Sequence, residues 1–312
     1  MHPASLRLGI DLGGTKTEIM ALAPGGAVAL RRRIPTPPGY DGLMRAVAEL
    51  VAGTEAELGR SGSLGMAIPG SESFGSGLIK NANTTWLNGR PLRADLERVL
   101  DREVRLANDA NCFALSEAID GAAAGAGTVF GVIAGTGVGG GVVVEGKVLA
   151  GAHGVGGEWG HIPLPAMTGA ERADSRLCYC GKRDCLETWC SGPFLEREFQ
   201  RRTGRALPLE EIARADGEDA NALIGHLVDR LARAMATVVN ILDPDVIVLG
   251  GGLSNIERLY RDLPPLVEAY AFTLGSPPRI VKNRHGDSSG VRGAAWLWPE
   301  YPPSGSEAAG QT

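Results

Sequence analysis

The chain has 312 residues, of which 44% are hydrophobic and 21% charged, so it is long enough for two globular domains with sizeable cores. Its formal net charge is −5 and its longest basic run is Arg31–Arg33, a balance that disfavours binding to a nucleic-acid backbone. The chain shows neither a secretory signal nor an apolar run of about 18 residues, so we expect a cytoplasmic protein without a membrane partner.

The first 120 residues predict strands that alternate with helices, which is the pattern of an α/β architecture. Residues 6–23 read as a strand, a glycine-rich turn and a second strand. Apolar spacing and turn residues then predict a strand at 27–36, a helix at 41–58, a strand at 64–70, a helix at 91–100, and a strand at 104–107 that leads into a helix.

A second unit is expected from residue 121, because residues 128–151 repeat the opening pattern of strand, glycine-rich turn and strand. This similarity indicates an internal duplication. Residues 151–190 read as irregular and contain most of the cysteines. The remaining predicted elements are a buried helix at 220–242, a strand and glycine-rich turn at 245–255, a final helix at 288–298 and a disordered tail at 304–312.

Three glycine-rich turns are candidates for binding a nucleotide. Residues 135–140 match G-x-G-x-x-G, but the β-branched residues that follow predict a strand, whereas a dinucleotide-binding fingerprint requires a helix there. We therefore expect two phosphate-binding hairpins and, at 250–254, a turn that lets an adenine approach the backbone. The nucleotide-binding residues would be Asp11, Gly13, Gly14, Thr15, Lys16, Gly135, Thr136, Gly137, Gly251 and Gly252.

Each of these turns, taken alone, also fits an ordinary tight turn, and Lys16 also fits a solvated hairpin lysine. The repetition of the first two turns in similar settings favours the phosphate-binding interpretation. Asp11 would hold a phosphate-bound Mg²⁺ through water, since Mg²⁺ keeps several waters in protein sites.

Asn108 and Asp109 directly follow a predicted strand and begin a predicted helix. Both residue types are favoured at helix N-termini, which is a sufficient structural explanation for them. In the functional interpretation, Asp109 is a general base that accepts the proton of a hydroxyl attacking a phosphate, an effect of about 10²–10⁴-fold. Asn108 would then hydrogen-bond a neighbouring hydroxyl.

Three of the five cysteines, Cys178, Cys180 and Cys185, lie within eight residues. They predict a zinc site, whose fourth ligand would come from the nearest upstream histidines, His153 and His161. With His161 the site is Cys₃His, has no open position and would be structural. A redox loop and incidental thiols are the competing interpretations, although the spacing is not that of a redox pair. Cys112 fits a small core residue, and Cys190 has no assigned role.

Glu158, His161 and Glu187 lie within or beside the predicted zinc segment. A metal that holds this segment would also hold their side chains, and such a polar group suits a polyhydroxylated ligand such as a sugar. His161 would bind zinc through one ring nitrogen and a sugar hydroxyl through the other. The competing interpretation of the two glutamates is that they are solvated loop carboxylates.

Together these motifs resemble the ROK family (repressor, open reading frame, kinase) over nearly the whole chain. The resemblance is carried by DLGGTK, NDANC, GTGVGGG, GGEWGH, CYCGKRDCLE and GGGLSN. Asp184 departs from the family pattern, which usually has glycine before the third cysteine. This departure affects the turn of the loop but removes no metal ligand.

The resemblance implies an actin-like, ribonuclease H-like fold of two α/β domains around a cleft. Residues 1–120 would form the small domain, completed by the C-terminal helix at about 288–300, and residues 121–287 the large domain with the zinc loop. It also implies ATP-dependent phosphorylation of a hexose hydroxyl, with Mg²⁺ on the nucleotide and a homodimer as the assembly. Asp109 would be the catalytic base, Asn83, Asn108, Glu158, His161 and Glu187 the sugar contacts, and His161, Cys178, Cys180 and Cys185 the zinc ligands.

Within the family, the segments NANTTWLNG, LANDANC, NILDPDVIVLGGG and HGDSSGVRGAAWLW most resemble bacterial fructokinases, which also accept mannose and form the 6-phosphate. N-acetylglucosamine kinases share NDANCFALSEA and GTGVGGG and are the alternative. The family also contains sugar-responsive repressors with an N-terminal helix-turn-helix domain. Here the first glycine turn begins near residue 11, so we expect an enzyme.

Overall fold

The computed structural model describes residues 6–273, 275 and 278–299, and the chain divides into two compact units. Unit 1 comprises the chain up to Cys112 and from Gly290 onward, and unit 2 comprises Phe113–Ser289. The boundary therefore lies several residues before the residue 120 expected from the sequence. The tail predicted at 304–312 lies outside the described residues.

The position of this boundary follows from the packing of helix α3 (Asp109–Ile119). Cys112 packs against helix α10 (Ser289–Trp296), where a Cβ added to Gly293 would collide with the Cys112 backbone. One residue further on, Phe113 packs against Gly131 and Gly250 in the sheet of unit 2. The two halves of α3 therefore contribute to different cores.

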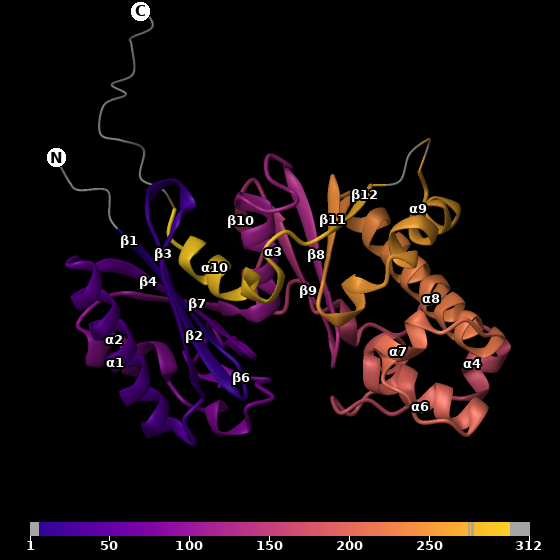
Figure 1. Ribbon diagram of the computed structural model, residues 1–312, viewed down its shortest axis with the longest axis horizontal. Coiled ribbons are helices and arrows are strands. Elements are labelled where there is room, and N and C mark those ends of the chain that lie inside the picture. Colours follow the sequence, from indigo (N-terminus) through magenta and orange to yellow (C-terminus); the bar gives the residue numbers. More distant parts are fainter. Residues whose placement is uncertain (1–5, 274, 276–277, 300–312) are drawn as a thin grey trace, which may run out of the picture. The chain divides into compact units, whose positions relative to one another are not determined.

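Unit 1 is built on a five-stranded sheet with the order β3-β2-β1-β4-β7 (Figure 1). The first three strands form an antiparallel meander, and β4 and β7 continue the sheet in parallel with β1. The strands are β1 (Leu6–Leu12), β2 (Lys16–Leu22), β3 (Val28–Pro35), β4 (Gly62–Ile68) and β7 (Val104–Asn108).

Different helices cover the two faces of this sheet. Helices α1 (Tyr40–Leu58) and α2 (Leu92–Leu100) bury their apolar residues against one face. Helix α10 covers the other, where Gly9 and Gly65 allow its backbone to approach, because a Cβ at either position would collide with it. This alternation follows from the two-residue period of strand side chains.

A short excursion follows β4 and contains elements that the sequence pattern did not predict. Strands β5 (Ser71–Glu72) and β6 (Ile79–Lys80) pair with each other, and the 3₁₀ helix η2 (Thr85–Leu87) comes after them. Gly70 begins the excursion with a φ of +154°, where a Cβ would lie 2.8 Å from Lys80 O. The excursion carries Asn83.

Unit 2 contains a second five-stranded sheet, with the order β10-β9-β8-β11-β12. Its meander and its two parallel strands repeat the arrangement in unit 1 strand for strand, which is the topology expected of an internal duplication. The strands are β8 (Thr128–Ala134), β9 (Val138–Val144), β10 (Lys147–Val148), β11 (Val246–Gly250) and β12 (Arg279–Lys282).

The core of unit 2 is organised around helix α8 (Glu218–Leu242), which runs for 25 residues. It packs against α6 (Gly192–Thr203), α7 (Leu209–Arg214) and α9 (Arg258–Tyr270). The cysteine-rich segment contains short helices, namely η3 (Trp159–His161), α4 (Gly169–Ala173) and α5 (Glu187–Cys190), and a 3₁₀ turn, η4 (Gly252–Asn255), follows β11.

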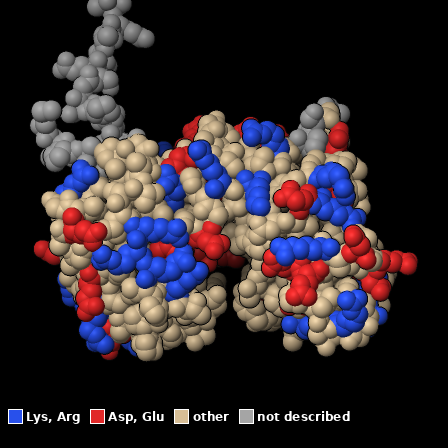
Figure 2. Space-filling model, in the orientation of Figure 1, with Lys and Arg blue, Asp and Glu red and all other residues tan. Residues whose placement is uncertain are grey.

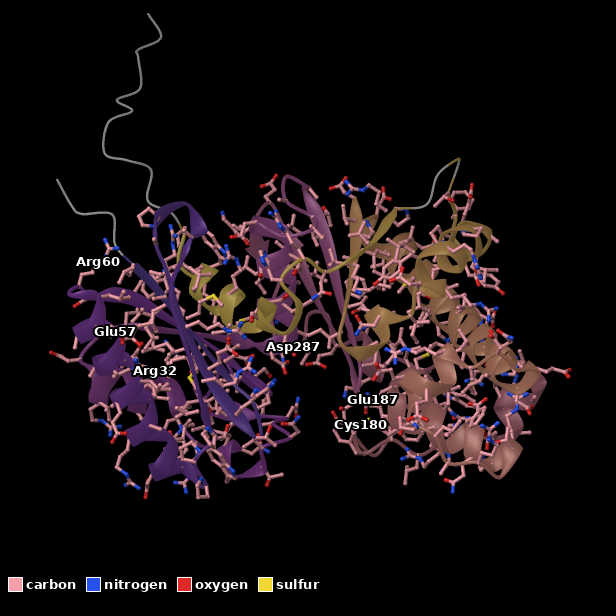
Figure 3. The ribbon with its side chains drawn as sticks, viewed as in Figure 1. Arg32, Glu57, Arg60, Cys180, Glu187 and Asp287 are labelled. Atoms are coloured by element: carbon pink, nitrogen blue, oxygen red, sulfur yellow. The ribbon has the colours of Figure 1, made fainter. Side chains whose placement is uncertain are left out.

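Charged side chains of both signs are mixed over the face shown in Figure 2. The basic run of the sequence lies on the edge strand β3, where Arg31 and Arg33 pair with Glu18 and Arg32 pairs with Glu57 (Figure 3). Each arginine of the run therefore has a carboxylate partner. In the part of the chain that the structure describes, no helix has the length and apolar character needed to cross a membrane.

Candidate active site

The turn between β1 and β2 places the first glycine-rich segment at the surface of unit 1. Gly13 donates its backbone N–H to Lys16 O at 3.0 Å, and a Cβ on Gly13 would lie 2.8 Å from that oxygen. Thr36 donates its hydroxyl to Gly13 O at 2.7 Å and its backbone N–H to Thr15 O at 3.0 Å. The turn is thus held at its base, while Gly14, Thr15 and Lys16 are exposed at its tip.

Two carboxylates, Asp11 and Asp109, lie at the carboxyl edge of the parallel strands of unit 1. Asp11 is in register with Ala67 of β4, and Asn108 ends β7 opposite Ile68. This edge is where ligand sites of α/β sheets usually form. Burial, and then the negative charge of Asp109, raises the pKa of Asp11 to about 7, so the two carboxylates are near enough to interact electrostatically.

Hydrogen bonds fix the side chains that begin α3. Asn108 donates from Nδ2 to Gly70 O at 3.2 Å and accepts at Oδ1 from the backbone N–H of Ala110 at 2.9 Å. Asp109 accepts at Oδ1 from the same N–H at 2.8 Å. The bonds orient the Asp109 carboxylate, which a general base requires.

Asn83 lies on the excursion after β4 and is exposed. Its Oδ1 accepts from the Thr84 hydroxyl at 3.4 Å. The adjacent backbone is fixed by Asn88, which accepts from Ala82 N at 2.9 Å and donates to Ala82 O at 3.0 Å. Sequence reasoning missed Asn88, for which the available signal was the turn-forming pair with Gly89.

The turn between β8 and β9 holds the second set of glycines. Gly135 donates to Gly137 O at 2.9 Å, and Gly192 N donates to Gly135 O at 2.8 Å. Glu187 accepts at Oε2 from Val138 N at 3.1 Å, and a Cβ on Gly137 would lie 2.7 Å from the same oxygen. Glycine at position 137 therefore makes room for the Glu187 carboxylate.

The third glycine turn lies beside the second, because β8 and β11 are parallel neighbours. Gly251 has a φ of +76°, and a Cβ on it would lie 2.5 Å from Ala134 O. A Cβ on Gly135 would lie 3.5 Å from Gly252 N. Thr136, Gly251 and Gly252 are exposed, so unit 2 presents open backbone on which a nucleotide can lie.

Four metal-binding side chains gather in the irregular segment of unit 2. One ligand atom each of His161, Cys178, Cys180 and Cys185 lies within 4.8 Å of the others, and His161 Nδ1 lies 3.7 Å from Cys178 Sγ. The sulfur atoms of Cys180 and Cys185 are 3.6 Å apart, close to the roughly 3.8 Å that tetrahedral zinc with bonds of about 2.3 Å imposes. The group fits zinc, and its imidazole is that of His161 rather than His153.

Asp184, where the family pattern has glycine, adopts the left-handed conformation that favours glycine, with a φ of +60°. Its carboxylate accepts from the Ser175 hydroxyl at 2.7 Å and from the backbone N–H of Arg176 at 2.7 Å. Its backbone oxygen accepts from Leu164 N at 2.8 Å. The aspartate side chain therefore ties the turn to the preceding segment.

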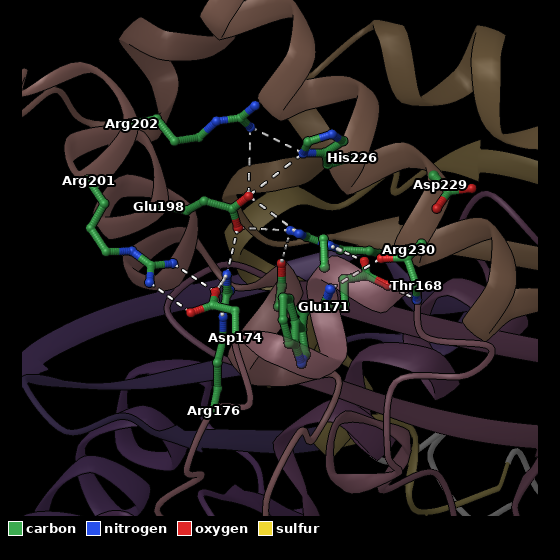
Figure 4. A pocket seen from close by; sticks show the side chains of 12 residues that line it. Thr168, Glu171, Asp174, Arg176, Glu198, Arg201, Arg202, His226, Asp229 and Arg230 are labelled. Carbon is green, nitrogen blue, oxygen red and sulfur yellow. Dashed lines mark hydrogen bonds and ion pairs between the residues drawn. The ribbon is translucent and has the colours of Figure 1, made fainter.

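An ion network anchors the metal-binding segment to α6 and α8 (Figure 4). The Trp189 ring lies 3.7 Å from the Arg176 guanidinium and 4.8 Å from that of Arg230. Both arginines bind Glu198, at 2.9 and 3.0 Å, and Arg230 also binds Glu171 at 3.0 Å. Both arginines are thus paired with carboxylates, and Glu198 and Arg230 tie the segment to α6 and α8.

Glu158, His161 and Glu187 form a polar group beside the metal-binding residues. Glu158 directly precedes η3, and Glu187 begins α5 two residues after Cys185. The pKa of Glu158 is raised, mainly by burial. The negative charge of Glu187 adds to this increase, and the nearby His161 partly offsets it. Figure 3 labels Glu187 and Cys180, which both belong to this segment of unit 2.

The second ring nitrogen of His161 has a different partner from the sugar hydroxyl expected from the sequence. His161 Nε2 lies 3.0 Å from the hydroxyl of Tyr179, and the two rings meet edge to face at 5.2 Å and 81°. Sequence reasoning missed Tyr179. Its position between the ligands Cys178 and Cys180 was the available signal.

A comparison of the whole sequence with protein-family models gives a match to the ROK family over residues 7–301. The chain belongs to the ROK family. The match includes both sheets, the three glycine turns and the metal-binding segment, so the family predicted from the sequence motifs is confirmed.

Curated relatives match along their whole length. The chain is 40% identical over 297 residues to the N-acetyl-D-glucosamine kinase of Escherichia coli O157:H7, covering 93% of this chain and 98% of that protein. It is 40% identical over 296 residues to the N-acetyl-D-glucosamine kinase of Vibrio cholerae, with the same coverage. These names do not confirm the fructokinase prediction and favour its alternative.

Solved structures agree with the family assignment. A ROK hexokinase from Thermus thermophilus superposes with a TM-score of 0.83 at 33% identity, covering 93% of this chain and 97% of that chain. A ROK glucokinase from Streptomyces griseus, in complex with glucose and AMPPNP, gives 0.75 at 26% identity over 94% and 98%. The predicted actin-like α/β fold and the predicted enzyme class, an ATP-dependent sugar kinase, are confirmed.

Proposed function

We propose that this ROK-family kinase transfers the γ-phosphoryl group of ATP to the 6-hydroxyl of N-acetyl-D-glucosamine. The observation that carries the choice of sugar is the full-length similarity to kinases named for it. The chemistry is supported independently by the interacting carboxylates Asp11 and Asp109 in unit 1 and by the polar group beside the metal-binding residues in unit 2.

In the proposed reaction, the sugar hydroxyl oxygen attacks the γ-phosphorus of ATP. The bond between the γ-phosphorus and the oxygen that bridges it to the β-phosphate breaks, and ADP leaves with that oxygen. The hydroxyl proton passes to the Asp109 carboxylate, which its bond to Ala110 N holds in one orientation. Asn108 and Asn83 hydrogen-bond other sugar hydroxyls. Most of the remaining acceleration in phosphoryl transfer comes from positioning and charge neutralisation.

Backbone N–H groups of the two glycine hairpins would contact the phosphates, and the turn at Gly251 and Gly252 the adenosine. Bound Mg²⁺ supplies positive charge that offsets the charge of the phosphates. Asp11 would hold the ion through water, and a nearby cation favours the ionised form of a carboxyl whose pKa is otherwise raised to about 7.

In unit 2, Glu158, His161 and Glu187 would contact the sugar. His161, Cys178, Cys180 and Cys185 would hold a structural zinc ion, which would fix the segment from which these side chains extend. Support comes from the fit of the Cys₃His group to a tetrahedral ion and from the bond between Glu187 and the second glycine hairpin.

An ATP-coupled assay over four sugars tests the proposal. We expect kcat/KM for N-acetylglucosamine to exceed that for fructose, mannose and glucose by at least about tenfold, because a site that pairs with a substrate's polar groups rejects analogues lacking them. Reactions without ATP serve as the control. Turnover of fructose with no turnover of N-acetylglucosamine would show that the fructokinase prediction was right and this proposal wrong.

The homodimer expected from the family resemblance is also part of the proposal. Light scattering coupled to gel filtration measures it directly, and twice the mass of the 312-residue chain is the expected result. A monomer mass over the concentrations used in the assay would contradict the homodimer without affecting the assigned reaction.

A further inference from the structure

Tyr179 lies between two metal-binding cysteines and reaches back to the metal-binding histidine. Its side chain is 78% exposed, yet its hydroxyl is 3.0 Å from His161 Nε2 and its ring packs edge to face on the imidazole. Tyr179 therefore contacts His161 specifically although most of its surface faces solvent.

The two nitrogens of the His161 ring have different environments. Nδ1 faces Cys178 Sγ at 3.7 Å, so it is the nitrogen that binds the metal. An imidazole bound to a metal through Nδ1 carries its ring proton on Nε2, which is then a single N–H donor. That donor points to the hydroxyl oxygen of Tyr179.

In the proposed function, this same Nε2–H group of His161 donates a hydrogen bond to a hydroxyl of the sugar. One N–H group forms one well-aligned hydrogen bond, so the phenol of Tyr179 and the sugar hydroxyl compete for it. We propose that the Tyr179 hydroxyl occupies the sugar's hydrogen-bonding position on His161 in the free enzyme, and that its displacement sets the affinity for the sugar. This inference rests on the proposed function.

The local structure allows the side chain to leave without moving the loop. The backbone on both sides of Tyr179 is anchored, because Cys178 N donates to Lys182 O at 2.8 Å and Gly181 N donates to Cys178 O at 3.0 Å. Since most of the Tyr179 side chain is exposed, a change of rotamer moves it into solvent.

The size of the effect follows from the fraction of enzyme in which Tyr179 has turned away. The apparent dissociation constant of the sugar equals the intrinsic constant divided by that fraction. A neutral hydrogen bond that competes with water favours the bonded position of the side chain over the displaced one by a factor of about two to ten. The free enzyme therefore binds the sugar about two- to tenfold more weakly than an enzyme without the hydroxyl.

The test is the variant Tyr179→Phe, which removes the hydroxyl and keeps the ring. Titration calorimetry with N-acetylglucosamine and the zinc-loaded enzyme, without ATP, is expected to show a Kd about two- to tenfold lower than in the unchanged enzyme. KM should fall with it and kcat stay the same. A merely structural role would not lower Kd while zinc content is unchanged.

Tyr270→Phe is the matched control, because Tyr270 is another partly exposed tyrosine of unit 2 whose hydroxyl binds a side chain, Asp229, at 2.7 Å. It should leave Kd unchanged. An unchanged or higher Kd in Tyr179→Phe, in an enzyme that still phosphorylates the sugar, would overturn the inference and leave the proposed function standing. Failure of the unchanged enzyme to bind any of the four sugars would overturn both.

Discussion

The two units carry the same sheet and the same glycine hairpin, but they hold the hairpin in different ways. In unit 1, a threonine hydroxyl, that of Thr36, bonds the Gly13 carbonyl at the base of the turn. In unit 2, the carboxylate of Glu187 bonds the backbone at Val138, and Glu187 follows the last metal-binding cysteine by two residues. The second hairpin is thereby coupled to the metal-binding loop.

The difference separates two tasks on one duplicated framework. Unit 1 gathers two half-buried carboxylates, Asp11 and Asp109, at a sheet edge, which suits proton and cation chemistry. Unit 2 gathers polar side chains on a segment whose Trp159, Leu186 and Trp189 pack into the core of the unit and whose cysteines and histidine can bind a metal. Substitutions that damage one unit's task and spare the other's are therefore the sharpest tests.

Asp109→Asn is expected to have the largest effect. The amide keeps the shape of the side chain but cannot accept the proton, so kcat should fall by about 10²–10⁴-fold while the Kd for the sugar stays within about threefold. Steady-state kinetics and calorimetry on the same preparation measure the two quantities.

Asp41→Asn is the matched control for this substitution, because Asp41 is an exposed aspartate near the start of α1. It should leave both constants unchanged. Turnover of Asp109→Asn within tenfold of the unchanged enzyme would remove Asp109 from its assigned role as general base.

Asp11→Asn should reveal the raised pKa of Asp11 through stability. The pKa of Asp11 rises from 3.8 to about 7 on folding. The folded protein therefore loses no stability from this group below pH 3.8, and it loses stability as the pH rises from there through about 7. The variant should therefore be more stable than the unchanged protein at pH 8, by up to about 4 kcal/mol, with the difference shrinking toward pH 5.

The measurement is thermal unfolding without Mg²⁺ or nucleotide, since a bound cation would reverse the charge preference of Asp11. Asp41→Asn again serves as the control and should show no such trend. A stability difference for Asp11→Asn that does not change with pH would mean that Asp11 is ionised in the folded protein throughout this range.

Cys185→Ser should disable recognition in unit 2. Loss of one thiolate lowers metal affinity, so we expect less than one zinc per chain and a sugar Kd about 10- to 100-fold higher. Elemental analysis and calorimetry measure both. Cys190→Ala, a buried cysteine outside the metal-binding group, should keep its zinc. Zinc-free unchanged protein with normal sugar affinity would contradict a structural role for the metal.

Features with a local signature could be predicted from the sequence. Helices α1 and α2 of unit 1 show the period of 3.6 residues that follows from burying one side of a helix. The glycine turns and the cysteine spacing are equally local. The motifs built on them were sufficient for the family and the fold, and the assigned roles of the candidate site residues stay predictions.

Features that depend on tertiary contacts could not be predicted. Strand β12 has four residues, too few to show a period. The buried face of helix α6 includes the charged residue Glu198, which binds Arg230 from α8, so its apolar pattern is incomplete. The choice between His153 and His161, and the contact of Tyr179 with His161, both depend on how the loop folds around its ligands. Local sequence patterns do not show which side chains will meet in the folded chain.

Asp184 shows how a local rule and a tertiary contact compete, and it has the smallest expected effect. Its positive φ favours glycine, so Asp184→Gly relieves backbone strain of up to about 1 kcal/mol. The same change removes two carboxylate hydrogen bonds, to Ser175 and Arg176, worth about 1.5 kcal/mol or more each because the acceptor is charged. The bonds outweigh the strain, so Asp184→Gly should destabilise the protein by about 2 kcal/mol, and Asp184→Ala, which loses the bonds and keeps the strain, by more. Thermal unfolding of the zinc-loaded variants ranks them, and a glycine variant more stable than the unchanged protein would show that the backbone strain outweighs the two hydrogen bonds.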